Sequence, residues 1–118
     1  MTFDPESLAS QDVLRLPIEV QPLGHDLVVV AVHSDIDLQE AGELRAVLND
    51  ACTGPHHTIQ VDLTDVHFIS SSGMGVLAEL SHRMSTQDRR LEAHHASDVI
   101  RSAFAIAGLG HILEPQVS

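Results

Sequence analysis

Short apolar segments with a two-residue period alternate along this chain with longer segments in which apolar residues recur every three or four positions. A two-residue period is typical of a strand with one wet face, and steps of three and four are typical of an amphipathic helix. The segments follow in the order strand, strand, helix, strand, helix, strand, helix. Because strand–helix–strand crossovers favour parallel neighbours, this order predicts an α/β fold with a mixed sheet of about four to five strands and helices packed on it.

The predicted strands differ in how they are covered. Pro17 lies in the first, residues 14–20, and indicates an edge strand because proline cannot donate to the hydrogen-bond ladder. The second, Leu27–Val32, is an unbroken apolar run, which is typical of a central strand covered on both faces. Two further strands are expected at residues 59–63 and 91–93.

Each predicted helix has a start signal. Asp37 is placed to cap the first helix, with a glutamate three residues on, and Gly54 and Pro55 end it. The second helix begins at or within the triplet 70–72, and the third begins near Ser97 and stops at Gly108. The turn chemistry therefore agrees with the apolar periodicity.

The formal net charge is −11, from 17 acidic and 6 basic residues. Such a field repels phosphate backbones and anionic lipid surfaces, and the chain has no Trp or Tyr on which bases could stack. We therefore expect neither nucleic acid nor a membrane as a partner, and we expect a protein with a basic face. The sequence does not indicate an oligomeric state.

A length of 118 residues fits one domain. Residues 1–12 have little periodic apolar content and are expected to be a flexible leader, with the folded domain at residues 13–118. No secretory signal opens the chain, and no stretch approaches the roughly 18 apolar residues of a membrane span. We therefore expect a cytoplasmic protein, in which Cys52, the only cysteine, forms no internal disulfide.

The nine histidines suggest a metal site, but His56–His57 and His94–His95 are adjacent pairs, and neighbours on a strand point to opposite faces. Surface histidine is the favoured interpretation, with no metal and no cofactor. A serine hydrolase using His67 is disfavoured because the chain lacks a G-x-S-x-G elbow. The usual glycine-rich phosphate loops are missing too, so we expect no enzymatic activity.

Three consecutive serines, Ser70, Ser71 and Ser72, follow the third predicted strand. A helix N-terminus exposes unpaired N–H groups and a partial positive charge, which favour anions and phosphates. From the pattern alone, one serine caps the helix and the others fill the turn. Gly73 and Gly75 either admit a partner backbone or pack the helix on its own sheet, and packing is favoured for Gly75.

The segment 61–77 reads VDLTDVHFISSSGMGVL and closely resembles the STAS-domain signature of anti-sigma factor antagonists. The resemblance covers roughly residues 16–113. Residues 34–37, Ser-Asp-Ile-Asp, look like the loop before the family's first helix, and residues 99–112 look like its last helix. The resemblance implies a single STAS-like domain.

In that family a serine at this turn is phosphorylated by a partner kinase that is also the anti-sigma factor. Ser71 matches this serine, and Ser72 is the second choice. The resemblance implies that the unphosphorylated chain binds the kinase and frees a sigma factor, and that phosphorylation, which adds roughly −1.5 to −2 charges, releases it. The chain would then be a phosphoprotein of a partner-switching stress response that regulates transcription. The expected partner-binding residues are Asp37, Ser70, Ser71, Ser72, Gly73 and Met74.

The sequence departs from the family pattern at Ser70, where the family has an aspartate before the phosphorylated serine. Serine cannot supply that charge, so an alternative stays open: a STAS scaffold or ligand-sensing interaction module that is never phosphorylated. Asp37 matches the family's aspartate beside the phosphorylation surface. It has two interpretations, kinase recognition and helix capping, of which capping contributes about 1 kcal/mol.

Overall fold

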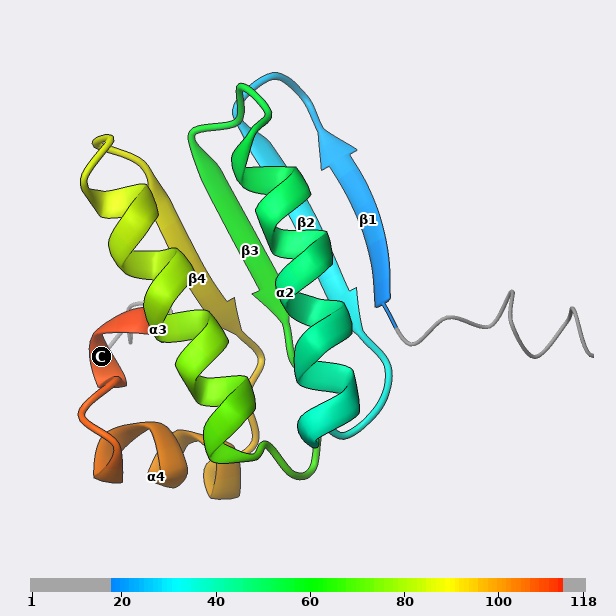
Figure 1. Ribbon diagram of the computed structural model, residues 1–118, viewed down its shortest axis with the longest axis vertical. Coiled ribbons are helices and arrows are strands. Elements are labelled where there is room, and N and C mark those ends of the chain that lie inside the picture. The colour runs from blue at the N-terminus through cyan, green and yellow to red at the C-terminus, as the bar shows by residue number, and fades with distance from the viewer. Residues whose placement is uncertain (1–17, 114–118) are drawn as a thin grey trace, which may run out of the picture.

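The computed structural model describes residues 18–113, which form a mixed four-stranded sheet in the order β1-β2-β3-β4 (Figure 1). The strands are β1 (Ile18–Leu23), β2 (Leu27–Val32), β3 (Thr58–Asp62) and β4 (Arg90–His94). β1 pairs antiparallel with β2, and β2, β3 and β4 pair parallel. The predicted fold class is therefore confirmed. The expected leader, residues 1–12, and the start of the first expected strand lie outside the described residues.

The helices of the described range are α2 (Leu38–Cys52), α3 (Ser71–Ser85) and α4 (Asp98–Ile106), followed by the 3₁₀ turn η2 (Gly110–Ile112). Figure 1 shows α2 and α3 side by side on one face of the sheet. Both helices begin at the edge where β2, β3 and β4 end, and α4 lies at that same end of the molecule. The predicted order of strands and helices is confirmed along the described chain.

The core lies between the sheet and these helices. Alternate residues of β2 are fully buried because the pleat of a strand points them toward one face. Helices α2 and α3 close the core from the other side with Leu44, Leu48, Leu77, Leu80 and Met84, each 0% exposed.

The central place of β2 is confirmed, but the expected cover on both of its faces is wrong. Leu27, Val29 and Ala31 are only half-buried, because among residues 18–113 α2 and α3 pack on the opposite face.

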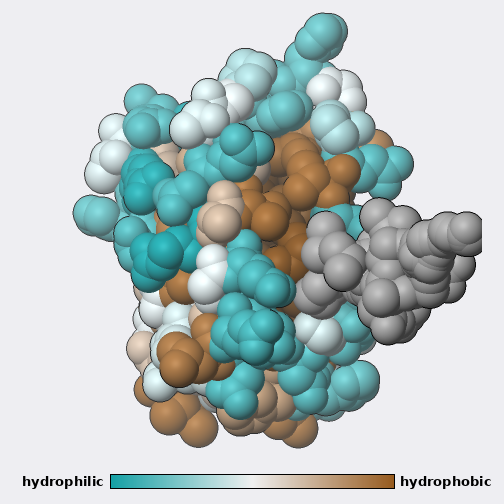
Figure 2. Space-filling view, turned by 45° about the vertical axis from the view of Figure 1, so that its right-hand side comes forward, coloured by the Kyte–Doolittle hydropathy of each residue, from teal (hydrophilic) through white to brown (hydrophobic). Residues whose placement is uncertain are grey.

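Strand β1 is an edge strand, as predicted, and all but its first residue are exposed. Beside it, Val20, Val28 and Val47 line an apolar hollow of about 210 Å³ between β1 and α2, visible in Figure 2.

The three predicted helix starts are confirmed. Asp37 caps α2 in a capping box with Glu40, Ser70 caps α3, and Ser97 caps α4 by accepting from the backbone N–H of Ile100. Each cap satisfies a donor that the first helical turn leaves unpaired. The left-handed backbone of Gly108, at φ +77°, follows the end of α4.

Arg89 has a structural role that the sequence pattern did not predict. Its guanidinium donates to the backbone carbonyl oxygens of Cys52, Gly54 and His56 at distances of 2.6–2.9 Å. These contacts fasten the loop after α2 to the start of β4. They lie at the far end of the sheet from the serine triplet.

Candidate functional site

The candidate site forms where two loops meet, one before α2 and one before α3. Ile36 and Ile69 form an isolated parallel bridge between these loops. The backbone N–H of Ile36 donates to the carbonyl oxygen of Phe68 at 2.9 Å, and that of Ser70 donates to the carbonyl oxygen of Ile36 at 2.7 Å. Main-chain hydrogen bonds therefore hold the starts of α2 and α3 next to each other.

Asp35 adds a side-chain contact between the same two loops. Its Oδ1 atom accepts hydrogen bonds from the backbone N–H groups of His67, at 2.7 Å, and Phe68, at 3.1 Å. The sequence placed Asp35 in the loop before the first helix without assigning it this contact. The partners lie 32 and 33 positions along the chain, so no local pattern reveals them.

Ser70 is the N-cap of α3. Its backbone is extended, with φ −75° and ψ 165°, and its Oγ accepts from the backbone N–H of Gly73 at 3.2 Å. A serine hydroxyl and an aspartate carboxylate both serve as caps, so Ser70 keeps the capping role at this position but carries no charge. Ser71 and Ser72 follow as the first two helical residues, and both are exposed.

Gly73 is a packing position rather than a surface position. A Cβ atom added there would lie 2.6 Å from Cγ2 of Ile36 and 2.9 Å from Cγ1 of Ile69. Only glycine fits this contact without a shift of its neighbours. Met74 is half-buried and packs against the core. Of the predicted partner-binding residues, Gly73 therefore lies beneath the surface and Met74 is partly covered.

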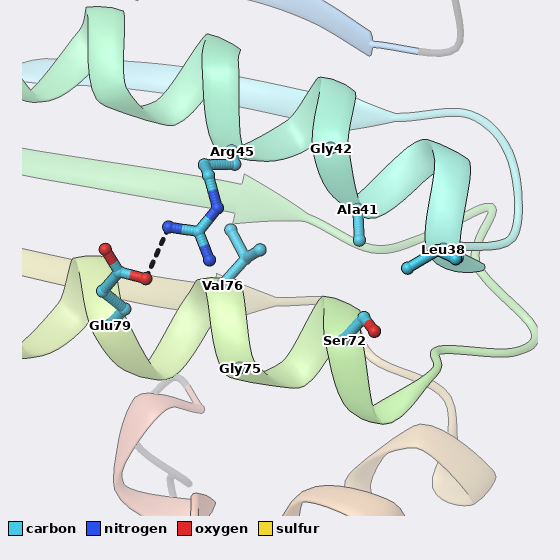
Figure 3. A pocket seen from close by; sticks show the side chains of 8 residues that line it. All are labelled: Leu38, Ala41, Gly42, Arg45, Ser72, Gly75, Val76 and Glu79. Atoms are coloured by element: carbon cyan, nitrogen blue, oxygen red, sulfur yellow. Dashed lines mark hydrogen bonds and ion pairs between the residues drawn. The ribbon is translucent and has the colours of Figure 1, made fainter.

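The prediction that Gly75 packs α3 against its own sheet is wrong. Nothing lies within 4 Å of a Cβ added at Gly75, and the residue is exposed. It lines a groove of about 520 Å³ between α2 and α3. Figure 3 shows Gly75 on α3 and Gly42 on α2 at this groove. The packing role belongs instead to Gly73, two residues earlier, because the contact depends on the position of Ile36 in three dimensions.

The groove begins beside the serine triplet. Leu38 and Ser72 lie near the starts of their helices, and the ion pair between Arg45 and Glu79 crosses the groove farther along (Figure 3). Leu38 is 71% exposed, although leucine is a residue that folding normally buries. Leu38 and Ser72 both line this groove, so the groove and the exposed start of α3 form one continuous surface.

The side chain of Asp37 caps the N-terminus of α2. Oδ1 accepts from the backbone N–H of Leu38 at 2.8 Å, and the backbone N–H of Asp37 donates to Oε1 of Glu40 at 3.1 Å. The capping interpretation of Asp37 is therefore confirmed. Its side chain is also exposed, at the same end of the molecule as Ser71.

Within residues 18–113, no three His, Cys, Asp or Glu side chains are arranged to hold a metal ion. None of the helices in that range is long and apolar enough to cross a membrane. His67 is exposed, and its Nδ1 lies 3.9 Å from Oδ1 of Asp35.

A family model described as "Mlab, STAS domain" matches residues 22–114, which include both loops and the serine triplet. The chain belongs to the STAS domain family. The resemblance of segment 61–77 to the STAS signature is thus confirmed, and the match extends over nearly all of the described residues.

Two curated relatives, from Listeria monocytogenes serovar 1/2a and Listeria innocua serovar 6a, are named anti-sigma-B factor antagonists. Each is 25% identical over 101 residues, a match that covers 86% of this chain and 89% of the relative. Among solved structures, the anti-sigma factor antagonist SpoIIAA in its unphosphorylated form is similar, with a TM-score of 0.73, 20% identity and coverage of 86% of this chain and 89% of that one. The phosphorylated form of the Bacillus cell fate determinant SpoIIAA gives a TM-score of 0.68 at 20% identity, with coverage of 86% and 92%.

Proposed function

We propose that this STAS domain is a cytoplasmic anti-sigma factor antagonist, a regulatory binding module rather than an enzyme. It binds an anti-sigma factor that is also a serine kinase, and phosphorylation of Ser71 releases it. The observation that carries the proposal is the exposed Ser71 in the first turn of α3, held beside the start of α2 by the Ile36–Ile69 bridge. The Listeria relatives of similar length and the SpoIIAA fold support this function.

The position of Ser71 suits a reversible phosphate. A helix N-terminus carries unpaired N–H groups and a partial positive charge, and the first turn of α3 contains no acidic residue. A phosphate on Ser71 can therefore be accommodated without unfolding the domain. The existence of a solved phosphorylated SpoIIAA with the same fold supports this point.

Phosphorylation releases the partner because it places negative charge on the surface that the partner contacts. Leu38, Ser72 and the groove between α2 and α3 offer an apolar surface next to Ser71. A partner that packs there must remove water from Ser71, and roughly −1.5 to −2 added charges make that desolvation unfavourable. The acidic balance of the chain favours a partner with a basic face.

The test uses the full chain immobilised and incubated with lysate of its source cells. A kinase recovered in this way is purified, incubated with the chain and ATP, and the phosphate is mapped by mass spectrometry. We expect phosphate on Ser71, retained binding by Ser71→Ala, and binding by Ser71→Glu weakened at least about tenfold, equal to about 1.4 kcal/mol. Ser85→Glu, which adds the same charge at the far end of α3, is the matched control and should bind normally. Undiminished binding by Ser71→Glu would refute the switch.

A second candidate function keeps the fold and the interface but omits the phosphate. Ser70 favours this second function. Its hydroxyl still caps α3, but it lacks the negative charge of the aspartate that the family has before the phosphorylated serine. In that case the chain is a constitutive scaffold or a ligand sensor. Partner capture that is identical with and without ATP, with no phosphate on Ser71 or Ser72, would favour this function over the first.

A further inference from the structure

His33 lies directly after β2, at the start of the loop that leads to α2, between two carboxylates from other parts of the chain. Its Nδ1 is 2.7 Å from Oδ2 of Asp65, which lies in the loop before the serine triplet. Its Nε2 is 2.9 Å from Oε1 of Glu19 on the edge strand β1. One imidazole ring therefore joins the edge strand to the loop that carries the candidate switch.

The protonation state of His33 decides whether both contacts can exist. A carboxylate offers only acceptors, and a neutral imidazole has a single N–H donor. Both ring nitrogens donate only in the imidazolium form. The observed geometry, with a carboxylate oxygen within hydrogen-bond distance of each nitrogen, therefore fits protonated His33.

We propose that His33 is a proton-operated clamp. As imidazolium it ties β1 to the loop before α3, and release of its proton to solvent removes one of the two ties and uncouples β1 from that loop. The clamp goes beyond the proposed kinase switch and does not depend on it, because it involves only residues of this chain. It makes the environment of the serine triplet sensitive to pH.

The hydrogen bond to Asp65, followed by that to Glu19, raises the pKa of His33 above its ordinary value of 6.5. A group whose pKa is raised by folding contributes stability that is fully present below its unfolded-state value and is lost as the pH rises through the folded-state value. The clamp is thus fully closed below about pH 6.5 and opens as the pH rises through the higher folded-state pKa of His33. Both contacts are partly exposed, so salt weakens them.

Other charged groups surround the clamp. Asp62 on β3 and His95, which follows β4, interact with each other, and the charge of His33 also acts on Asp62. His67 lies in the loop itself, with its ring 3.9 Å from Asp35. Because His67 is a second histidine in the same loop, the test must separate its effect from that of His33.

NMR titration of the full chain provides this test. The ring protons of His33 report its midpoint, and the backbone amides of Val20 and Val66 report β1 and the loop. We expect both amides to shift with the His33 midpoint in the wild type, to lose that transition in His33→Gln, and to keep it in His67→Gln. The clamp would be overturned if the amides of Val20 and Val66 kept their pH transition in His33→Gln. It would also be overturned if the two amides shifted at different midpoints in the wild type.

A second set of variants leaves His33 in place. Asp65→Asn and Glu19→Gln should each lower the His33 midpoint, because each removes one carboxylate that favours the imidazolium. Glu43→Gln removes one negative charge from the exposed surface of α2 and should leave the midpoint unchanged. A His33 midpoint insensitive to both Asp65→Asn and Glu19→Gln would refute the proposal even if the His33→Gln protein were unstable.

Discussion

Gly73 on α3 faces Ile36 so closely that a Cβ atom added to the glycine would lie 2.6 Å from Cγ2 of the isoleucine. This contact connects the first turn of α3, through its buried glycine, to the loop before α2. It explains why the surface serines Ser71 and Ser72 are followed by a residue without a side chain. The same helix contains Gly75, which has no such neighbour, so the two glycines provide an internal comparison.

Gly73→Ala should destabilise the protein by about 1–3 kcal/mol, because the methyl group overpacks the contact with Ile36 and Ile69. Gly75→Ala should stabilise it by up to about 1 kcal/mol, because alanine favours a helix interior and the space is open. Urea unfolding followed by circular dichroism measures both. Equal effects of the two variants would show that the contact at Gly73 is not tight.

Asp35→Ala should lower the free energy of unfolding by about 1–2 kcal/mol, because the N–H groups of His67 and Phe68 lose a charged acceptor. Hydrogen exchange of these two amides should accelerate, while exchange in the middle of α3 should change little. Asp35→Asn keeps an acceptor oxygen and should have a smaller effect. Glu43→Ala serves as the control; if it accelerated loop exchange as much as Asp35→Ala does, the assigned anchor would be wrong.

Ser70→Ala should cost about 1 kcal/mol, because the backbone N–H of Gly73 loses its cap. Ser70→Asp restores a cap and adds a negative charge at the helix N-terminus, a favourable interaction of about 0.3–1 kcal/mol. Ser70→Asp should therefore be at least as stable as the wild type in thermal unfolding. Under the proposed function it should also be phosphorylated faster, which a time course with the purified kinase measures.

Asp62 should make the protein sensitive to acid. Burial acts to raise the pKa of Asp62, but hydrogen bonds from the hydroxyl and backbone N–H of Thr64, together with the charges of His95 and His33, outweigh it and hold the pKa below its ordinary value of 3.8. A lowered pKa contributes stability above the unfolded-state value that is lost as the pH falls through the folded-state value. The window therefore lies below about pH 3.8.

Asp62→Asn should flatten the dependence of the unfolding free energy on pH in that window, since asparagine does not titrate. Unfolding in urea at a series of pH values between neutral and acid measures the slope. Glu43→Gln, which also removes a carboxylate, should keep the wild-type slope. An unchanged slope in Asp62→Asn would mean that other carboxylates cause the acid sensitivity.

Much of the fold follows from local chemistry and was therefore predictable. The alternation of apolar residues predicts β3, and the caps Asp37 and Ser97 mark helix starts because each acts on a backbone group only a few residues away. The start of α3 within the serine triplet was predictable for the same reason. These features depend on neighbours in the sequence.

The parts that were missed depend on residues distant in the sequence. The sequence shows two glycines in one turn but not that Ile36 packs against Gly73 and leaves Gly75 open. Likewise, an apolar run predicts a covered strand without showing that β2 has its helices on one face. The contacts of Asp35 and His33 with the loop before α3 join positions 32 or 33 apart and required the folded chain.

The bridge between Ile36 and Ile69 sets the spacing of α2 and α3 through main-chain atoms. The exposed side chains of Asp37, Ser71 and Ser72 contribute nothing to that bridge. Ser71 and Ser72 can therefore be replaced during evolution while the two helix starts keep their arrangement. Under the proposed function, a few surface substitutions on an unchanged scaffold are therefore enough for descendants of one ancestor to recognise different partners.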